Sequence, residues 1–452
     1  MTEEQNAINR RGFLRTVGAA GLAGVGLTAR RFDGETVRRF EGETVSRPTV
    51  QPSNRPTVQP SDRPTVQPSD RPTVQPSDRA EYPQVPKRKF GKTDIEVSCL
   101  GLGTMFNLVD AQIVLRSTIN WGVKYWDTAA SYGGGNSELG IGIYLEKNPQ
   151  VRKELFIATK ASGAGNNVAR VEERLQTSLK RMHTDYIDLY YAPHGADDPA
   201  QFTDELRQWA ESAKKRKLIR FFGFTTHSNM AKCLAGAAKH DWIDAVMTSW
   251  NFRLMQDQEL SDAIEACYKA GKTIIAMKTT GRTTIQRFKL SIETEADKEL
   301  VANFRQRGFS EEQAALKLVL QDKRISAAPV QMENTAVLKA NVAAVLDKTE
   351  LTEADKEVFK EYALATCSSY CAGCAHICNS ALPDVPYVSD IMRYLMYYNS
   401  YGDKARAKEL FAQIPASVRS RLLNADYGVA EARCPQHLPI AKIVCEAVSK
   451  LA

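Results

Sequence analysis

The sequence lacks any apolar run of about 20 residues, the length that a helix needs to cross a bilayer, so no transmembrane segment is expected among its 452 residues. It also lacks a strong charge of either sign, because its formal net charge is only +7 and many of its arginines fall within the first 80 residues. A modest charge of this kind gives little reason to expect nucleic acid as a partner. A hydrophobic fraction of 43% and a charged fraction of 25% are typical of a globular protein.

The cysteines are too unevenly placed for a disulfide framework. Three of the nine, Cys99, Cys233 and Cys267, are scattered through the middle of the chain, and the other six all follow residue 366. An odd total with one dense group indicates a metal site instead.

The N-terminal residues have the order of an export signal. Asn9 to Arg15 read N-R-R-G-F-L-R and are followed by a weakly apolar, Gly/Ala-rich stretch from Thr16 to Ala29. Paired arginines before such a stretch are typical of a twin-arginine signal, although a chance Arg-Arg pair would look the same. We expect residues 1–29 to direct the chain through the twin-arginine translocase to the periplasm, with a membrane tether if the signal is not cleaved.

Residues 30–86 are expected to form a linker. From Arg30 to Asp78 the chain repeats in units of eight residues, with Ser46 as one extra residue, and four of the units read R-P-T-V-Q-P-S-N/D. Proline removes backbone donors and favours extended geometry in the residue before it. The pattern therefore predicts a disordered, proline-rich spacer.

From residue 87 to about residue 346, short apolar runs alternate with amphipathic helical windows such as Ala111–Trp121 and Ala169–Met182. This alternation predicts an α/β fold, a (β/α)8 barrel. A doubly wound open sheet would alternate in the same way, but no G-x-G-x-x-G follows the first strand, which argues against that fold. The eight predicted strands are Val97–Gly101, Val123–Asp127, Leu155–Lys160, Tyr186–Tyr190, Ile219–Phe224, Ala245–Thr248, Thr273–Met277 and Ile325–Ala328.

In such a barrel the active site lies at the C-terminal ends of the strands. Asp127 closes the second predicted strand, and Tyr132 lies in the loop after it. Lys160 closes the third strand, and His194 follows the fourth. These four side chains come from three consecutive strand–loop junctions, so we expect them to converge in one pocket.

Several segments resemble the aldo/keto reductase family, namely W-D-T-A-A-S-Y-G, F-I-A-T-K, D-Y-I-D-L-Y-Y-A-P-H and K-L-I-R-F-F-G-F-T-T-H. The resemblance runs from about Lys87 to Leu346 and fills the four positions of the family's catalytic tetrad in order. It implies that the barrel interconverts a carbonyl and an alcohol with NADP or NAD as cofactor.

The chemistry of the four residues can also be argued from their side chains. Reducing a carbonyl requires a proton for the developing alkoxide. Tyr132 is the natural donor, although a free phenol with a pKa of about 10 donates poorly near neutrality. Lys160 nearby would lower that pKa, and Asp127 would keep Lys160 charged. His194 could donate a hydrogen bond to the substrate oxygen.

Each of these residues taken alone could be structural, and Asp127 with Lys160 could be an ordinary buried ion pair. In addition, one more residue than is usual in the family separates Asp188 from His194, with Pro193 directly before the histidine. That insertion could displace the imidazole.

The resemblance further implies a nicotinamide site beside the tetrad. Thr225 and Thr226 fall where the family places small polar residues on the carboxamide, and Met277 falls where it places a stacking aromatic ring. The glutamine that contacts the same amide aligns with Met247.

At the other end of the cofactor, the family's residues that hold the 2′-phosphate of NADP align with Gln331, Met332 and Val337, and the adenine-side asparagine aligns with Asn341. A 2′-phosphate without a cationic partner is poorly held. The sequence therefore leaves the choice between NAD and NADP open.

The C-terminal module, residues 347–452, is predicted to be α-helical and cysteine-rich. It contains the spacing Cys367-x3-Cys371-x2-Cys374-x3-Cys378, followed much later by Cys434-Pro435. The region resembles the ferredoxin-like tail of the iron–sulfur subset of aldo/keto reductases, in which cysteines hold the clusters. In that subset a second motif of three cysteines precedes the final Cys-Pro. Here those positions are Asn424, Tyr427 and Ala430, so the resemblance implies one 4Fe-4S cluster.

Two ligand sets are open. Ferredoxin spacing selects Cys367, Cys371 and Cys374 with Cys434, whereas a local set takes Cys378 as the fourth ligand. Four thiolates would suit zinc as well.

Together these features predict an exported oxidoreductase with a small-molecule carbonyl or alcohol substrate, in which a redox partner protein could exchange electrons with the cluster. The helical, Tyr-rich segment from Tyr387 to Ile414 is expected to pack against the barrel. The alternative is a catalytically silent, exported electron-transfer or binding protein that reuses the barrel.

Overall fold

The computed structural model describes residues 82–281, 295–400 and 402–452, which belong to one compact unit beginning at Tyr82. The predicted export signal and most of the predicted linker lie outside the described residues. The last linker residues, 82–86, belong to the compact unit, where Val85 is buried and its N–H donates to the carbonyl of Trp121 at 3.1 Å.

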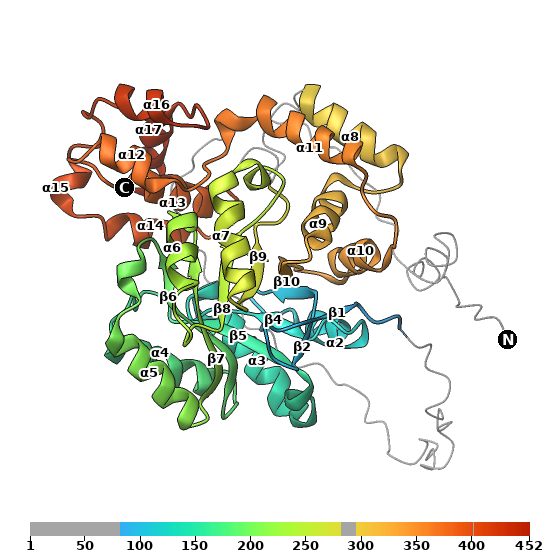
Figure 1. The fold of residues 1–452 in the computed structure, drawn as a ribbon. Coiled ribbons are helices and arrows are strands. Elements are labelled where there is room, and N and C mark those ends of the chain that lie inside the picture. The colour runs from blue at the N-terminus through green and yellow to red at the C-terminus, as the bar shows by residue number, and fades with distance from the viewer. Residues whose placement is uncertain (1–81, 282–294, 401) are drawn as a thin grey trace, which may run out of the picture. The chain divides into compact units, whose positions relative to one another are not determined.

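Eight parallel strands form a closed barrel in the order β10-β3-β4-β5-β6-β7-β8-β9 (Figure 1). This confirms the predicted (β/α)8 barrel and excludes the open sheet. The strands are β3 (Leu100–Gly103), β4 (Tyr125–Asp127), β5 (Phe156–Lys160), β6 (Ile187–Ala196), β7 (Ile219–Thr226), β8 (Ala245–Ser249), β9 (Thr273–Met277) and β10 (Ile325–Gln331).

The strand predicted over Val97–Gly101 is two strands. β2 (Glu96–Ser98) pairs antiparallel with β1 (Lys87–Lys89), and only β3 enters the barrel. The hairpin places Phe90, which is 1% exposed, against Phe156 at the start of β5, with ring centroids 5.0 Å apart. Aromatic side chains fill the N-terminal end of the barrel. An open site is therefore expected at the C-terminal end.

Helices surround the barrel because each buries one apolar face on the strands. In α4, for example, Val171, Leu175 and Leu179 are buried at a spacing of four residues, as expected for an amphipathic helix. The helices up to the end of the barrel are α2 (Gln112–Asn120), α3 (Asn136–Lys147), α4 (Val168–Arg181), α5 (Asp204–Lys215), α6 (Met230–Ala237), α7 (Gln258–Lys269), α8 (Glu295–Gln306), α9 (Glu311–Gln321) and α10 (Thr335–Leu346).

Short 3-10 turns are present in several connections of the barrel and in the C-terminal module. They are η3 (Tyr132–Gly135), η4 (Pro149–Glu154), η5 (Pro199–Gln201), η6 (Leu254–Gln256) and η8 (Cys367–Ser369).

The C-terminal module is helical, as predicted, and has its own hydrophobic core around Ile391, Phe411 and Val444. Figure 1 shows its helices gathered beyond one end of the barrel. They are α11 (Glu353–Ala365), α12 (Ala375–Ala381), α13 (Val388–Ser400), α14 (Lys404–Ala412), α15 (Ala416–Arg419), α16 (Gly428–Arg433) and α17 (Ile440–Leu451). Within the described ranges, no helix has both the length and the apolar character that spanning a membrane requires.

A buried arginine fastens this module to the barrel loops. Arg253 follows β8 and donates hydrogen bonds to the carbonyl of Gly281 at 2.7 Å, to the carbonyl of Ala363 at 3.2 Å and to Thr366 Oγ1 at 2.7 Å. Its guanidinium also lies 5.2 Å from the ring centroid of Tyr370. The chain just before the cysteine-rich loop is therefore held against the barrel mouth.

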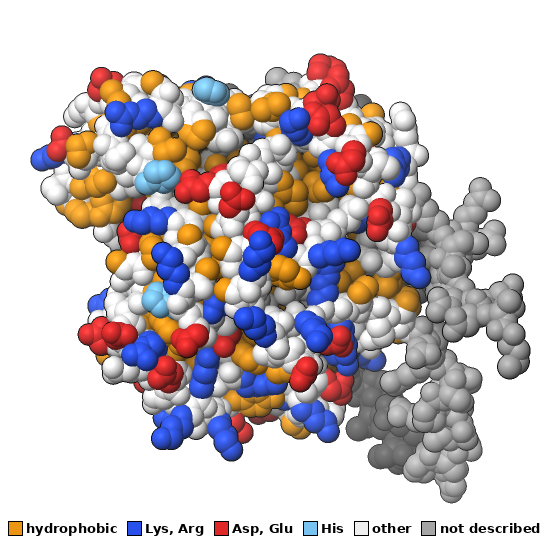
Figure 2. Space-filling model, viewed as in Figure 1, with side chains coloured by type: hydrophobic (Ala, Val, Ile, Leu, Met, Phe, Trp, Pro, Cys, Tyr) orange, Lys and Arg blue, Asp and Glu red, His pale blue; other side chains and the backbone are white. Residues whose placement is uncertain are grey.

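The surface carries both signs of charge. On the face shown in Figure 2, Lys and Arg side chains are interspersed with Asp and Glu side chains over the barrel helices. That face has no continuous basic surface of the kind that binds nucleic acid.

Candidate active site

A cavity of about 840 Å³ lies at the C-terminal ends of the barrel strands. Its volume is in the range of small-molecule sites. Barrel loops supply Tyr132, His194 and His227 to its wall, and the C-terminal module supplies Arg393 and Arg406. The helical segment that the sequence predicts to pack against the barrel therefore also lines its largest cavity among the described residues.

All four predicted tetrad residues meet at this cavity. Asp127, Tyr132 and His194 line it, and Lys160 is 1% exposed directly behind them. The Lys160 ammonium forms an ion pair with Asp127, donates to the carbonyl of Thr128 at 2.7 Å and lies 4.8 Å from the ring centroid of Tyr132. The convergence predicted from three strand–loop junctions is thus present in the fold.

Burial shapes the electrostatics of the ion pair. It lowers the pKa of the Lys160 ammonium, an effect that Asp127 opposes, and it raises the pKa of the Asp127 carboxyl, an effect that Lys160 opposes. A lysine with a lowered pKa is closer to a phenol in acidity, which favours sharing of a proton between them. Lys160 is therefore suited to assist Tyr132.

The extra residue before His194 is absorbed by a bulge in β6. Tyr191 is opposite Gly223 of β7 and His194 is opposite Thr225, so three steps on β6 match two on β7. A bulge of this kind re-aims side chains without breaking the sheet. The imidazole consequently stays at the cavity, and the displacement considered from the sequence does not occur.

Two serines hold the imidazole of His194. Ser131 donates to Ser162 Oγ at 3.0 Å, and Ser162 Oγ lies 3.1 Å from His194 Nδ1. When the Ser162 hydroxyl donates to Nδ1, the ring carries its proton on Nε2, and Nε2–H is then its donor.

The same imidazole is held in its neutral form. Burial, followed by the charges of Lys160, Arg406 and Arg393, lowers the pKa of His194 to about 3. At neutral pH the ring is therefore an uncharged hydrogen-bond donor, which suits the role proposed for it at the substrate oxygen.

The residues expected at the nicotinamide are only partly in the cavity wall. Met247 and Met277 line it, but Thr225 and Thr226 do not. Thr225 Oγ1 accepts from the Gly195 N–H at 2.9 Å, and Thr226 Oγ1 donates to the carbonyl of Ser228 at 2.9 Å. Both hydroxyls are thus used within the protein.

The wall also includes residues that were not anticipated from the sequence, among them His227, Ser228 and Lys278. These three lie one or two positions after the C-terminal end of a barrel strand, β7 or β9. Position after a strand was the signal that could have identified them.

At the other end of the cavity, Gln331, Val337 and Asn341 form part of the wall, whereas Met332 is fully buried outside it. Glu312 lines the same end. None of the described residues that line it alongside Gln331, namely Ser310, Glu312, Gln313, Val337, Ala340 and Asn341, carries a positive charge.

Four cysteines line a second, small cavity of about 20 Å³ in the C-terminal module. They are Cys371, Cys374, Cys378 and Cys434, so the structure brings together neither of the two sets expected from the sequence. Burial raises the pKa of Cys374 to about 12, and the other three thiols add to the increase.

Cys367 does not line that cavity. Its thiol lies near enough to Arg253, a residue of the barrel loops, to raise the pKa of the guanidinium. In the part of the chain that the structure describes, no three Cys, His, Asp or Glu side chains converge closely enough to hold a single metal ion.

Two of the three positions of the missing second cysteine motif hold buried side chains. Tyr427 is buried, and its hydroxyl donates to the carbonyl of Leu422 at 2.7 Å, while Ala430 is completely buried in the same core. Asn424, at the remaining position, is exposed.

The two cavities adjoin each other. Cys371, Ser389 and Met392 line both of them. The loop between them is docked on the barrel through Gly373, whose carbonyl accepts from the Asn229 N–H at 2.9 Å. Gly373 has φ +82°, and a Cβ atom there would come within 2.1 Å of the carbonyl oxygen of His227, so only glycine allows this approach.

Comparisons with known proteins agree with the barrel fold and show its family. A family model described as "Aldo/keto reductase family" matches residues 99–360, and one described as "PT disordered repeat" matches residues 43–79. The uncharacterised oxidoreductase YqkF of Bacillus subtilis (strain 168) is 31% identical over 155 residues, which cover 31% of this chain and only 48% of YqkF. L-galactose dehydrogenase of Arabidopsis thaliana is 26% identical over 301 residues, which cover 62% of this chain and 93% of that protein.

Among solved structures, the aldo-keto reductase AKR11C1 of Bacillus halodurans has a similar fold, with a TM-score of 0.51 and 23% identity. The match covers 62% of this chain and 96% of that one. The C-terminal part of this chain thus extends beyond what the relatives share.

Proposed function

Because the chain belongs to the aldo/keto reductase family, we propose that it is an NAD(P)-dependent oxidoreductase that interconverts a small carbonyl compound and the corresponding alcohol. The observation that carries the proposal is that Tyr132, Asp127 and His194 line one cavity, with Lys160 buried behind them and paired with Asp127. A catalytically silent protein would have no need of all four groups in this arrangement. The name of the plant relative, a dehydrogenase of L-galactose, favours a polar, sugar-like substrate.

The cavity fits a nicotinamide dinucleotide. Its wall runs from Met277 beside the tetrad to Gln331 and Asn341 on β10 and α10, which is the path that the family resemblance implies. When bound, the nicotinamide supplies or accepts the hydride.

The residues of the chain handle the proton and the substrate oxygen. In the reducing direction, His194 Nε2–H donates a hydrogen bond to the carbonyl oxygen, and the Tyr132 hydroxyl gives its proton to that oxygen as it becomes an alkoxide. The Lys160 ammonium stabilises the phenolate that remains, and Asp127 holds Lys160 in position. In the oxidising direction the same phenolate takes the proton back.

For the metal site, we propose that Cys371, Cys374, Cys378 and Cys434 hold one 4Fe-4S cluster. The support is that these four line one cavity and that ferredoxins likewise combine a local group of cysteines with a distant Cys-Pro. In a cluster each thiolate binds a different iron, whereas zinc needs all four within about 2.3 Å of one ion. Metal analysis of the purified protein separates the two.

For localisation, we propose export through the twin-arginine translocase to the periplasm. The support is the N-R-R-G-F-L-R motif and the weakly apolar stretch that follows it. This pathway transports folded proteins, which suits a chain that acquires a cluster before export and then meets a redox partner protein.

The test of the enzymatic proposal is a Tyr132→Phe variant, assayed for NADH- or NADPH-dependent reduction of a panel of small aldehydes. We expect turnover to fall by about 100-fold or more, because general acid catalysis contributes at least that factor, while dinucleotide binding is retained. Tyr190→Phe is the matched control, because Tyr190 is buried away from the cavity and its hydroxyl donates to the carbonyl of Val171 at 3.1 Å. Undiminished activity of Tyr132→Phe would rule out the proposed mechanism.

A further inference from the structure

The C-terminal module brings two arginines to the substrate end of the cavity. Arg393 on α13 and Arg406 on α14 both line it. Both lie close enough to His194 for their charges to lower its pKa, and Arg393 has the same effect on His227. Because His194 faces the substrate oxygen, the two guanidinium groups belong to the substrate end and not to the adenosine end.

Each arginine is held in place by a carboxylate of its own helix. Arg393 forms an ion pair with Asp390, and Arg406 Nη1 lies 2.8 Å from Glu409 Oε2. Neither carboxylate lines the cavity. A guanidinium has five N–H donors, and one carboxylate occupies only part of them.

The acidic residues near the arginines are engaged elsewhere. Asp403 lines the cavity, but its carboxylate caps α14 by accepting from the Arg406 N–H at 3.2 Å. Asp127 is paired with Lys160. The side chains of Arg393 and Arg406 are 18% and 21% exposed, so they are neither fully solvated nor sealed off from a ligand.

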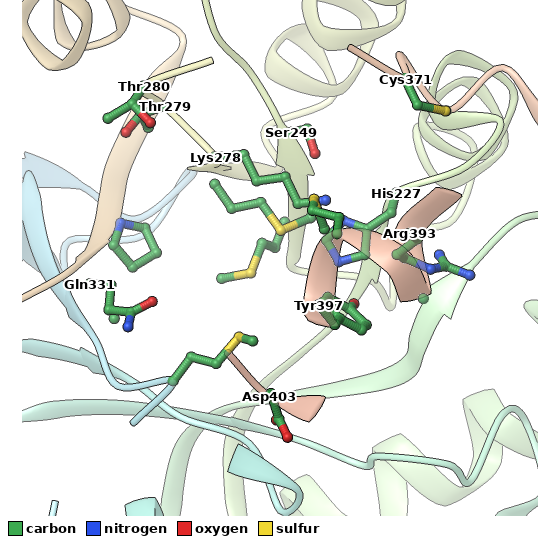
Figure 3. Close-up of a pocket in the computed structure, with 18 of the residues that line it drawn as sticks. His227, Ser249, Lys278, Thr279, Thr280, Gln331, Cys371, Arg393, Tyr397 and Asp403 are labelled. Carbon is green, nitrogen blue, oxygen red and sulfur yellow. The ribbon is translucent and has the colours of Figure 1, made fainter. Parts of the chain in front are cut away.

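A histidine beside Arg393 adds a polar group without a partner. Figure 3 shows His227, Arg393 and Tyr397 side by side, with Lys278 next to His227. The Nδ1 atom of His227 is buried and has no hydrogen-bond partner among the described residues.

We propose that Arg393 and Arg406 form an anion-binding subsite, so that the substrate is a carbonyl compound or alcohol that carries a carboxylate or a phosphate group. The inference rests on the proposed function and deepens it by naming the substrate class. Guanidinium groups match carboxylate and phosphate through paired N–H donors, and each of these two groups keeps donors that its own carboxylate does not occupy. The C-terminal module then selects the substrate.

The first test compares two pairs of aldehydes that differ by the anion: 4-oxobutanoate with butanal, and glyceraldehyde 3-phosphate with glyceraldehyde. In at least one pair we expect kcat/KM to be at least about tenfold higher for the anionic member, the factor that one hydrogen bond to a charged group contributes. The pair that shows the preference identifies the anion as carboxylate or phosphate. A difference below about twofold in both pairs overturns the proposal.

The second test replaces Arg406, because removing Arg393 would leave the carboxylate of Asp390 without its partner. Arg406→Gln should lower the ratio of kcat/KM for the preferred anionic aldehyde to kcat/KM for its neutral counterpart by at least about tenfold; an unchanged ratio would contradict the proposal. Arg421→Gln is the control, because this side chain is 59% exposed, pairs with Asp384 and does not line the cavity. A weaker affinity of Arg406→Gln for NADH or NADPH would instead mean that the arginine serves the cofactor, and the proposal would be wrong.

A binding measurement separates this inference from the proposed function. If the native protein reduces none of the four aldehydes, the proposed function fails, and calorimetry with succinate and with glycerol 3-phosphate then tests the subsite alone. Binding of either anion that Arg406→Gln weakens and Arg421→Gln does not supports the subsite. Absence of binding to both anions overturns it.

Discussion

The surroundings of His194 resist a second proton on its imidazole. Burial and the charges of Lys160, Arg406 and Arg393 bring its pKa to about 3, and Ser162 Oγ lies 3.1 Å from its Nδ1. At the scale of single residues, the site thus depends on groups from the barrel loops and from the C-terminal module at once.

The lowered pKa of His194 predicts how acid affects stability. In the unfolded chain the imidazole takes up a proton below about pH 6.5, but in the folded protein it does so only near pH 3. As the pH falls from 6.5 towards 3, the unfolded chain therefore binds a proton at this residue that the folded protein does not, and the free energy of unfolding decreases. His194→Gln should lose less stability than the native protein between about pH 7 and about pH 4.5, as measured by urea unfolding. The pKa of His227 is also lowered, but this residue is present in both proteins, so its contribution to the loss of stability is common to them. Equal losses in the two proteins would therefore contradict the lowered pKa of His194.

The adenosine end of the cavity predicts a preference for NAD. Glu312 lines that end together with Gln331, and a carboxylate repels the 2′-phosphate of NADP. Fluorescence titration should therefore give a lower Kd for NADH than for NADPH. Gln331→Arg should reverse the order, because a guanidinium pairs with the phosphate. The exposed Gln258→Arg on α7 is the control and should leave the ratio unchanged.

The sequence predicted the tetrad because its four residues occupy fixed places after consecutive strands. It could not predict Arg393 and Arg406, which reach the cavity from helices roughly 200 positions later than His194 in the chain. Nothing in a local pattern states where such helices dock. The same holds for Thr225 and Thr226, since only the packed structure reveals that their hydroxyls are used internally.

At the scale of individual elements, too, the local sequence pattern did not predict how the strands and helices pack. All residues from Val97 to Leu102 are buried, so no alternation of exposed and buried positions marks the break between β2 and β3. The insertion before His194 was visible in the sequence, but its accommodation as a bulge follows from pairing with β7. The cysteine loop was recognisable by spacing, and its ligand set depends on where the helices place each thiol.

At the level of this loop, Gly373 provides a sharp test of docking. Gly373→Ala combines an unfavourable left-handed backbone, worth roughly 1 kcal/mol, with a Cβ atom 2.1 Å from the carbonyl oxygen of His227. Gly402→Ala is the matched control, because its φ is +67° and nothing lies within 4 Å of its Cβ position. We expect thermal unfolding of Gly373→Ala to begin at clearly lower temperature than that of Gly402→Ala. Equal stabilities would show that the loop does not depend on this contact.

The arrangement of thiols predicts which cysteines retain iron. Serine at Cys371, Cys374, Cys378 or Cys434 should abolish or greatly reduce bound iron and sulfide, because each lines the small cavity. Cys367→Ser and Cys445→Ser should retain both, since neither residue lines it. Iron and sulfide analysis of anaerobically purified protein decides the matter. Loss of iron from Cys367→Ser with retention in Cys378→Ser would restore the ferredoxin-spaced set, and zinc in place of iron would rule out the cluster.

On the scale of the whole molecule, a barrel and a helical module share one cavity. The barrel contributes the tetrad and the path for a dinucleotide, and the module contributes the arginines and the adjoining cysteine cavity. The sequence predicted a barrel and further C-terminal helices, because each part has its own pattern of apolar residues. It did not predict that they enclose one site, because that depends on contacts such as those of Arg253 and Gly373.

The central claim is direct transfer of hydride to a carbonyl carbon in this cavity, with the proton supplied by Tyr132. The measurement that tests it most directly is a single turnover with reduced dinucleotide that carries deuterium at both C4 positions of the nicotinamide and an aldehyde substrate, followed by mass analysis of the alcohol. The account predicts one deuterium on the alcohol carbon for each dinucleotide oxidised, and no alcohol from Tyr132→Phe on the same timescale. An alcohol without deuterium, or equal yields from both proteins, would contradict it.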